Sequence, residues 1–162
     1  MESAGTRHPL IINDRVDVAM TLNAKGVHLA YHSIGITEAK GIMPPGMIAG
    51  ASVHSLDEAL YAEEAGADYL LFGHVYPSQS KPGLPPKGVD QLAEIVDRLT
   101  IPVIALGGID LSRINEVLAT GCAGIAMISA IFSAENPRQA LHAAAEAVVR
   151  YPGPPKTALC LD

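Results

Sequence analysis

Six short apolar runs alternate with segments of helical periodicity, and this alternation limits the folds open to the chain. The runs are nearly continuous and rich in Val, Ile and Leu, which is typical of parallel strands covered by helices. The expected strands are residues 9–13, 27–30, 47–51, 68–73, 102–106 and 122–128. The expected helices are residues 16–24, 37–42, 56–65, 89–99, 111–120 and 137–151. The pattern predicts about six βα units, arranged as an open doubly wound sheet or as most of an eight-stranded barrel.

Short signals mark the ends of several expected helices. Ser55 and Glu58 form an S-x-x-E capping box, in which each side chain bonds the other residue's backbone N–H. Gly26, Gly66 and Gly121 each follow a helical segment and precede an apolar run. We expect all three glycines to adopt the left-handed conformation that ends a helix.

Length and charge restrict the domain count and the partners. The chain has 162 residues, and we expect a single domain at residues 1–151 followed by a flexible C-terminal tail at residues 152–162. The formal net charge is −6, aromatic residues make up 4% of the chain, and Trp is absent. Nucleic-acid-binding domains need a basic surface and often use aromatic platforms, so we expect no nucleic-acid partner.

Targeting signals and cysteine usage favour a cytoplasmic protein with no membrane partner. The first residues contain no apolar stretch typical of a signal peptide. Residues 117–134 carry no charge, but Gly and Ser residues interrupt them, which favours a buried strand over a membrane span. Cys122 and Cys160 are too few for a disulfide framework and are interpreted as reduced thiols.

Polar and glycine residues gather where the expected strands end, which is the ligand-binding edge of parallel α/β folds. Gly107 and Gly108 follow the fifth run, and Ser129 follows the sixth. Glycine lets a backbone approach a ligand closely, and exposed N–H groups can bind phosphate. Together the two segments predict a phosphate site, although each alone also fits a tight turn or a helix cap.

Three histidines, His32, His54 and His74, also follow expected strands. An imidazole at this edge can exchange protons near neutral pH, which makes His74 a candidate catalytic residue. The alternative is a histidine whose nitrogens are satisfied by the backbone. The three histidines belong to successive units and have no carboxylate cluster beside them, so we expect no metal site.

A long connection, residues 75–88, follows the fourth run. Loops of this length commonly cover or bind ligands. Lys81 and Lys87 supply positive charge there for an anionic ligand. A solvated surface loop is the alternative.

Several segments, taken in order, resemble a known family. They are Gly50-Ala-Ser52-Val-His54-Ser55, Gly66-Ala-Asp-Tyr69, Phe72-Gly73-His74-Val75, Ile101-Pro-Val-Ile-Ala-Leu-Gly-Gly108 and Ser129-Ala-Ile-Phe132. Over about residues 9–150 the chain resembles the thiamin phosphate synthase/TenI family of (β/α)8 TIM barrels. The resemblance implies an α/β barrel, N-terminally truncated here to about six βα units, that binds a small-molecule thiazole phosphate in thiamin biosynthesis.

One strand end separates the two branches of this family. Synthases typically carry Gly-Pro-x-Phe-Pro-Thr-x-Thr-Lys, where this chain has Gly73-His74-Val-Tyr-Pro-Ser-Gln-Ser-Lys81. Histidine in place of proline resembles the TenI branch, the thiazole tautomerases. That likeness implies an isomerase that aromatises a carboxythiazole phosphate tautomer without a cofactor, with His74 moving the proton as base and then as acid. The implied binding residues are Ser52 at the ring, together with Lys81, Gly107, Gly108, Ile128 and Ser129.

Two other functions stay open. A thiamin phosphate synthase would couple a pyrimidine diphosphate to a thiazole phosphate with magnesium. Its Gly-Gln-x-Asp magnesium pattern is replaced here by Leu29-Ala-Tyr-His-Ser33, whereas Asn13-Asp14 is kept. A non-catalytic relative would only bind a phosphate ligand or a partner subunit. Six strands would also leave two exposed sheet edges, so we expect a homo-oligomer formed through them.

Overall fold

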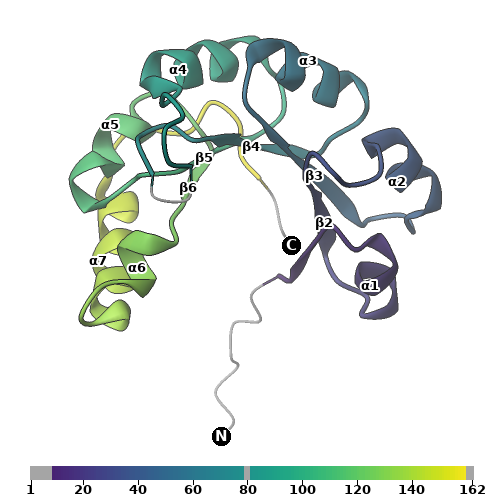
Figure 1. Ribbon diagram of the computed structural model, residues 1–162, viewed down its shortest axis with the longest axis horizontal. Helices are drawn as coiled ribbons and strands as arrows, with labels where there is room; N and C mark the ends of the chain where they lie inside the picture. The colour runs from purple at the N-terminus through teal and green to yellow at the C-terminus, as the bar shows by residue number, and fades with distance from the viewer. Residues whose placement is uncertain (1–8, 79–80, 160–162) are drawn as a thin grey trace, which may run out of the picture.

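Six parallel strands form one sheet in the computed structural model, which describes residues 9–78 and 81–159. The strands lie in chain order: β1 (Ile11–Asn13), β2 (Gly26–Leu29), β3 (Ile48–Val53), β4 (Tyr69–Gly73), β5 (Val103–Leu106) and β6 (Gly124–Ala126). The sheet curls into an arc with the helices on its convex side (Figure 1). A doubly wound sheet would reverse its strand order and carry helices on both faces. The chain therefore forms six units of a (β/α) barrel, which confirms the barrel prediction.

The helices follow the strands as expected, with one addition. They are α1 (Val16–Thr21), α2 (Ile36–Ile42), α3 (Leu56–Glu64), α4 (Gly88–Arg98), the 3-10 turn η1 (Leu111–Arg113), α5 (Ile114–Leu118), α6 (Ser129–Phe132) and α7 (Pro137–Arg150). Helix α6 was not among the expected helices. Its four residues are too few to show a helical period in the sequence, which is why the pattern missed it.

The glycine prediction is correct at two positions and wrong at the third. Gly66 and Gly121 have φ angles of +94° and +79°, in the left-handed region. Gly26 is instead the first residue of β2, and Asn23, with a φ of +48°, makes the left-handed turn after α1. A Cβ on Gly26 would lie 2.4 Å from the Ile48 carbonyl oxygen. Gly26 is therefore required by close strand packing rather than by a turn.

The predicted capping box begins α3, with one difference in its pairing. The Glu58 N–H donates to Ser55 Oγ at 3.2 Å. The Glu58 carboxylate, however, accepts from the backbone N–H of His54 at 2.6 Å, one residue before the N-cap. The box thus ties the loop after β3 to the start of α3.

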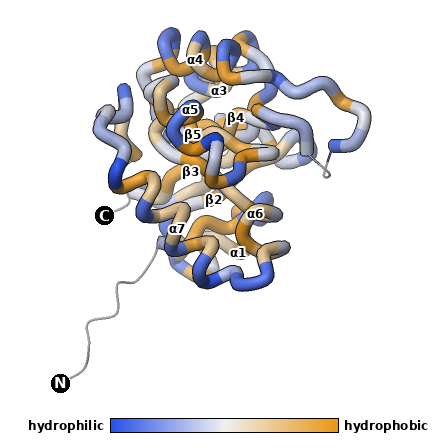
Figure 2. Tube along the Cα trace, turned by 90° about the vertical axis from the view of Figure 1, so that its left-hand side faces the viewer, coloured by the Kyte–Doolittle hydropathy of each residue, from blue (hydrophilic) through white to orange (hydrophobic). Residues whose placement is uncertain are grey.

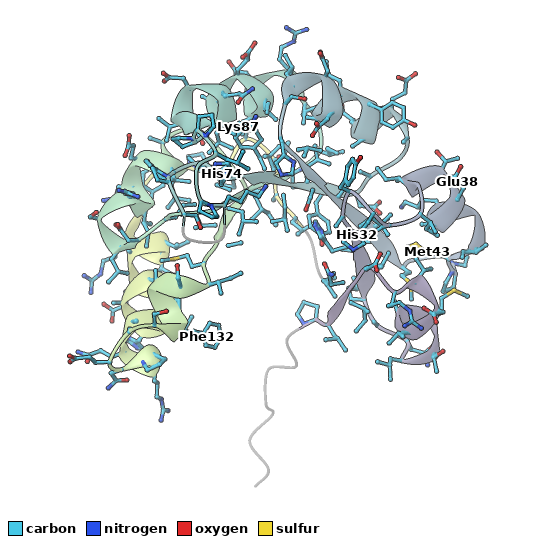
Figure 3. All side chains as sticks on the ribbon, viewed as in Figure 1. His32, Glu38, Met43, His74, Lys87 and Phe132 are labelled. Carbon is cyan, nitrogen blue, oxygen red and sulfur yellow. The ribbon has the colours of Figure 1, made fainter. Side chains whose placement is uncertain are left out.

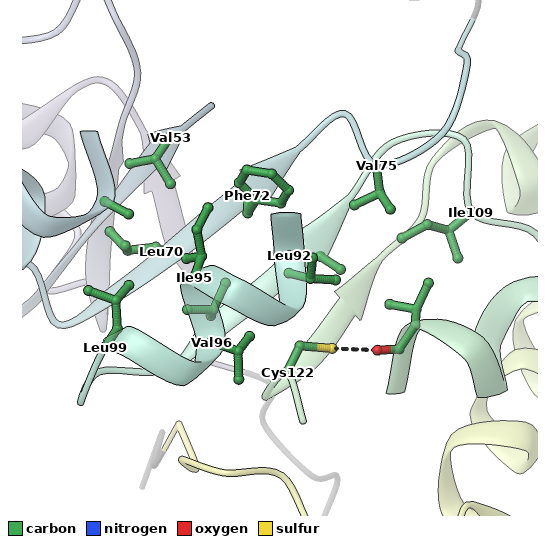
Figure 4. Close-up of a cluster of buried hydrophobic side chains, with 14 of the residues drawn as sticks. Val53, Leu70, Phe72, Val75, Leu92, Ile95, Val96, Leu99, Ile109 and Cys122 are labelled. Carbon is green, nitrogen blue, oxygen red and sulfur yellow. Dashed lines mark hydrogen bonds between the residues drawn. The ribbon is translucent and has the colours of Figure 1, made fainter. Parts of the chain in front are cut away.

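The main hydrophobic core lies between the sheet and the helices. Leu70 and Phe72 of β4 belong to the same buried cluster as Leu92 and Ile95 of α4, and all four are completely buried (Figure 4). Burying a side chain of this size stabilises the fold by about 1.5–3 kcal/mol. Figure 2 shows hydrophobic strands beneath helices that carry hydrophilic residues. Because strand side chains alternate between faces, the remaining strand residues face the concave side of the arc.

Other expectations about the chain are only partly covered by the described residues. The domain boundary at residue 151 stays a prediction, and within the expected tail Lys156 Nζ donates to the Val96 carbonyl at 3.0 Å. Cys122 is free and buried, and burial raises the pKa of its thiol. Cys160 lies outside the described residues. Within residues 9–78 and 81–159, no helix is long and apolar enough to cross a membrane, and the cytoplasmic location stays a prediction.

Candidate functional site

A cavity of about 420 Å³ opens at the carboxyl ends of the strands, on the concave side of the sheet. Its walls come from the ends of strands β2 to β6 and from the loops that follow them. All seven binding and catalytic residues expected from the sequence line this one cavity: Ser52, His74, Lys81, Gly107, Gly108, Ile128 and Ser129. The structure therefore brings the expected residues together, while the role of each stays a prediction.

The Gly107-Gly108 turn forms one wall of the cavity, and side chains are excluded from it. The two φ angles are +99° and +65°. A Cβ on Gly107 would lie 2.6 Å from His74 Cβ, and one on Gly108 would lie 2.5 Å from the Pro77 carbonyl oxygen. The backbone N–H groups of Gly108 and Ser129 have no acceptor among the described residues. Unpaired N–H groups beside a cavity are suited to a phosphate oxygen.

Lys81 is the cation at the cavity wall, and His54 holds it there. Lys81 Nζ lies 2.6 Å from His54 Nε2, and His54 Nδ1 lies 3.6 Å from a Glu58 carboxylate oxygen. Burial, with Lys81 as the second cause, lowers the pKa of His54. A neutral His54 accepts from the Lys81 ammonium and keeps its own proton on Nδ1, toward Glu58.

His74 lies under the loop that follows β4 and is almost completely buried. Its Nε2 is 3.3 Å from the Leu84 carbonyl oxygen of that loop. Its Nδ1 is buried and has no hydrogen-bond partner among the described residues. The backbone around the ring is also tied down, since the Lys87 N–H donates to the His74 carbonyl at 2.9 Å.

Candidate metal ligands are sparse in this region. His32 lies apart from His74 along the arc (Figure 3). Within the described ranges, no group of three or more His, Cys, Asp or Glu residues could hold a metal ion. Asp14 follows β1, and its Oδ1 already accepts from Ser33 Oγ at 2.6 Å. Magnesium is commonly held by one or two carboxylates plus substrate phosphates, so Asp14 would hold a magnesium ion only together with phosphate groups of a bound substrate.

Two buried polar residues near the cavity were missed in the sequence. His28 on β2 contacts Ser52 Oγ through Nε2 at 2.9 Å and Tyr69 Oη through Nδ1 at 3.2 Å. Burial lowers the pKa of His28 and raises the pKa of Tyr69 to about 12. The available signal was a histidine inside an otherwise apolar strand, at the face shared with Ala30, which lines the cavity.

A curled parallel sheet whose cavity lies at the carboxyl ends of its strands defines the (β/α)-barrel class of ligand-binding proteins. The chain belongs to the thiamine monophosphate synthase family, whose family model matches residues 3–131. It is 47% identical over 129 residues to a thiamine-phosphate synthase of Pyrococcus horikoshii, covering 80% of this chain and 62% of that protein. A thiamine-phosphate synthase of Chlorobium luteolum is 45% identical over 131 residues, with the same two coverages.

One solved structure supports this assignment. The thiamine phosphate pyrophosphorylase of Pyrococcus furiosus superposes with a TM-score of 0.80 at 44% identity, over 88% of this chain and 68% of that one. The chain thus spans about 62% of the length of the curated relatives named above.

The expected thiazole tautomerase activity, and with it the isomerase class, is wrong. Relatives that are 45–47% identical over most of this chain are named thiamine-phosphate synthase, which is a transferase. The prediction depended on one side chain, His74, in place of proline. The ring of His74 packs beneath the loop, with Nε2 near Leu84 and Nδ1 sealed, so this histidine does not by itself indicate the tautomerase branch.

Proposed function

We propose that the chain carries the synthase reaction for which its relatives are named. In that reaction a pyrimidine diphosphate and a thiazole phosphate are coupled, and inorganic pyrophosphate leaves. The observation that carries the proposal is the single cavity in which Lys81, the Gly107-Gly108 turn and Ser129 lie together. A substrate pair that carries three phosphoryl groups needs such a collection of positive charge and N–H donors.

The cavity residues divide into two sets in this proposal. Lys81 faces the diphosphate, because an ammonium group stabilises the negative charge that grows on a leaving pyrophosphate. Gly107, Gly108, Ile128 and Ser129 hold the phosphate of the thiazole partner through backbone N–H groups. Ser52 contacts the ring region.

His74 remains the proposed catalytic residue, but the proton transfer of a tautomerase is not its role. In the present geometry its Nε2 contacts the loop that carries Lys81. His74 also lines the cavity, and we propose that its ring contacts the bound substrate there. His74→Asn would then lower turnover more than it lowers substrate affinity.

The test is a coupling assay with both precursors and magnesium, in which thiamine phosphate and pyrophosphate are measured. We expect product with the unaltered chain, and we expect Lys81→Met to lower kcat/KM at least tenfold. Lys25→Met, before β2 at the opposite end of the strands, is the matched control and should leave kcat/KM unchanged. Absence of product with the folded, unaltered chain would overturn the proposal, and so would an unchanged kcat/KM in Lys81→Met.

We also propose that the chain forms a homo-oligomer, since β1 and β6 each pair with only one strand among the described residues. An open edge presents unpaired N–H and C=O groups to another chain. A cytoplasmic location fits the proposed biosynthetic role.

A further inference from the structure

A buried polar chain runs from the interior of the sheet to the cavity wall. Tyr69 Oη lies 3.2 Å from His28 Nδ1, and His28 Nε2 lies 2.9 Å from Ser52 Oγ. Tyr69 and His28 are 5% and 8% exposed, whereas Ser52 lines the cavity. The three residues come from the neighbouring strands β4, β2 and β3. The hydroxyl at the cavity is therefore connected to two groups that are almost completely buried.

Gly50 makes this connection possible. In the sheet register, Gly50 lies between His28 on one side and Tyr69 on the other. A Cβ at Gly50 would lie 2.0 Å from the Tyr69 ring, so the ring passes over the bare backbone of β3. The ring centroids of His28 and Tyr69 are therefore only 5.7 Å apart, although strand β3 lies between their own strands.

The donors and acceptors of Tyr69, His28 and Ser52 favour one tautomer of the His28 ring. Both rings are uncharged near neutral pH, because burial lowers the pKa of His28 and raises the pKa of Tyr69 to about 12. A neutral imidazole has one donor and one acceptor. With the proton on Nδ1, His28 would donate to Tyr69, and the Tyr69 hydrogen would need a second acceptor, which is not found among the described residues. With the proton on Nε2, Tyr69 donates to Nδ1, Nε2 donates to Ser52 Oγ, and each buried donor has an acceptor.

We propose that Tyr69 is a positioning residue that acts through His28 on Ser52. It holds His28 in the Nε2–H tautomer, which occupies a lone pair of Ser52 Oγ and leaves the Ser52 hydroxyl hydrogen for the cavity. Ser52 thereby acts as a hydrogen-bond donor toward an acceptor atom of the substrate, such as a ring nitrogen or a phosphate oxygen. The inference rests on the proposed function only in taking the cavity as the substrate site.

The first test reads the tautomer directly and needs no activity. Nitrogen-15 spectra of the histidine-labelled chain identify the His28 signals as those that are missing in His28→Gln. We expect the Nε2–H form in the unaltered chain and in Tyr61→Phe, a control at a largely exposed tyrosine on α3. Tyr69→Phe removes one oxygen and should shift His28 to a mixture of tautomers. An Nδ1–H or doubly protonated His28 at pH 7, or an unchanged tautomer in Tyr69→Phe, would overturn the inference.

The second test asks whether Tyr69 acts through Ser52. Tyr69→Phe and Ser52→Ala are each expected to lower kcat/KM of the coupling reaction about tenfold. Because both act on one donor, the double variant should fall little further than Ser52→Ala alone. Multiplied losses in the double variant would show that Tyr69 acts elsewhere and would overturn the proposal. If the unaltered chain makes no product, the proposed function fails while the tautomer spectra still decide the positioning role.

Discussion

Gly107 lies where the backbones after two neighbouring strands nearly touch. An alanine there would combine left-handed backbone strain with a Cβ placed 2.6 Å from His74 Cβ. We expect Gly107→Ala to lower the free energy of unfolding by about 3 kcal/mol. Gly46→Ala is the matched control, because Gly46 has a φ of +86° and a Cβ added to it would meet nothing within 4 Å; about 1 kcal/mol is expected there. Urea denaturation of both variants measures the difference, and equal losses would contradict the close approach.

His28 makes stability depend on pH in a predictable direction. Burial lowers the pKa of His28 from its ordinary value of 6.5, so below that pH the unfolded chain binds more protons than the folded one. The stabilising contribution is therefore complete above pH 6.5 and is lost as the pH falls through the lower folded pKa. Unfolding free energies measured from pH 7.5 downward should fall less steeply in His28→Gln. Part of this pH dependence of the unfolding free energy should remain in His28→Gln, because the pKa of His54 is lowered as well.

The matched control for this pH series is His142→Gln. His142 lies on α7 with its side chain 76% exposed, so this variant removes a histidine without disturbing a buried group. A slope that is the same in His28→Gln and in the unaltered chain would contradict a buried neutral His28.

The start of helix α3 links the stability of that helix to the cavity. Ser55 caps the helix, and Glu58 of the same box binds the N–H of His54, which holds Lys81. Ser55→Ala should lower the free energy of unfolding by about 1 kcal/mol, since one helix N–H loses its acceptor. Ser133→Ala, after the last residue of α6, should change it by no more than about 0.5 kcal/mol. Thermal or urea denaturation checks both values, and equal effects would contradict the capping role.

The helices and strands also show what local sequence patterns can and cannot predict. Every expected strand and helix is present, with boundaries that differ by three residues at most. The capping signals succeeded because a cap depends on residues that are close in the chain. Gly26 was misread because its reason is Ile48 on the next strand, 22 residues away, and a local pattern contains no information about that contact.

The open sheet edge at β1 provides a test of self-association. Leu10 precedes β1 and is 53% exposed. If copies pair through this edge, Leu10→Lys should shift the chain toward monomer, because charge on an edge opposes strand pairing. Sedimentation velocity at several protein concentrations measures the shift. Leu141→Lys, at an exposed leucine on α7, is the control, and an equal response of the two variants would exclude the β1 edge.

The βα units of this protein, and the strand ends where its site residues lie, can be predicted from local sequence patterns. Apolar runs, helix caps and strand-terminal polar residues are local features, so Ser52, His74 and Gly107 could be placed at one edge before the fold was known. By contrast, the folded chain was needed to show that the sheet curls in chain order and that His28, Gly50 and Tyr69 meet behind Ser52. These contacts depend on which strands are neighbours and on which face of the sheet each residue occupies, and local patterns contain neither.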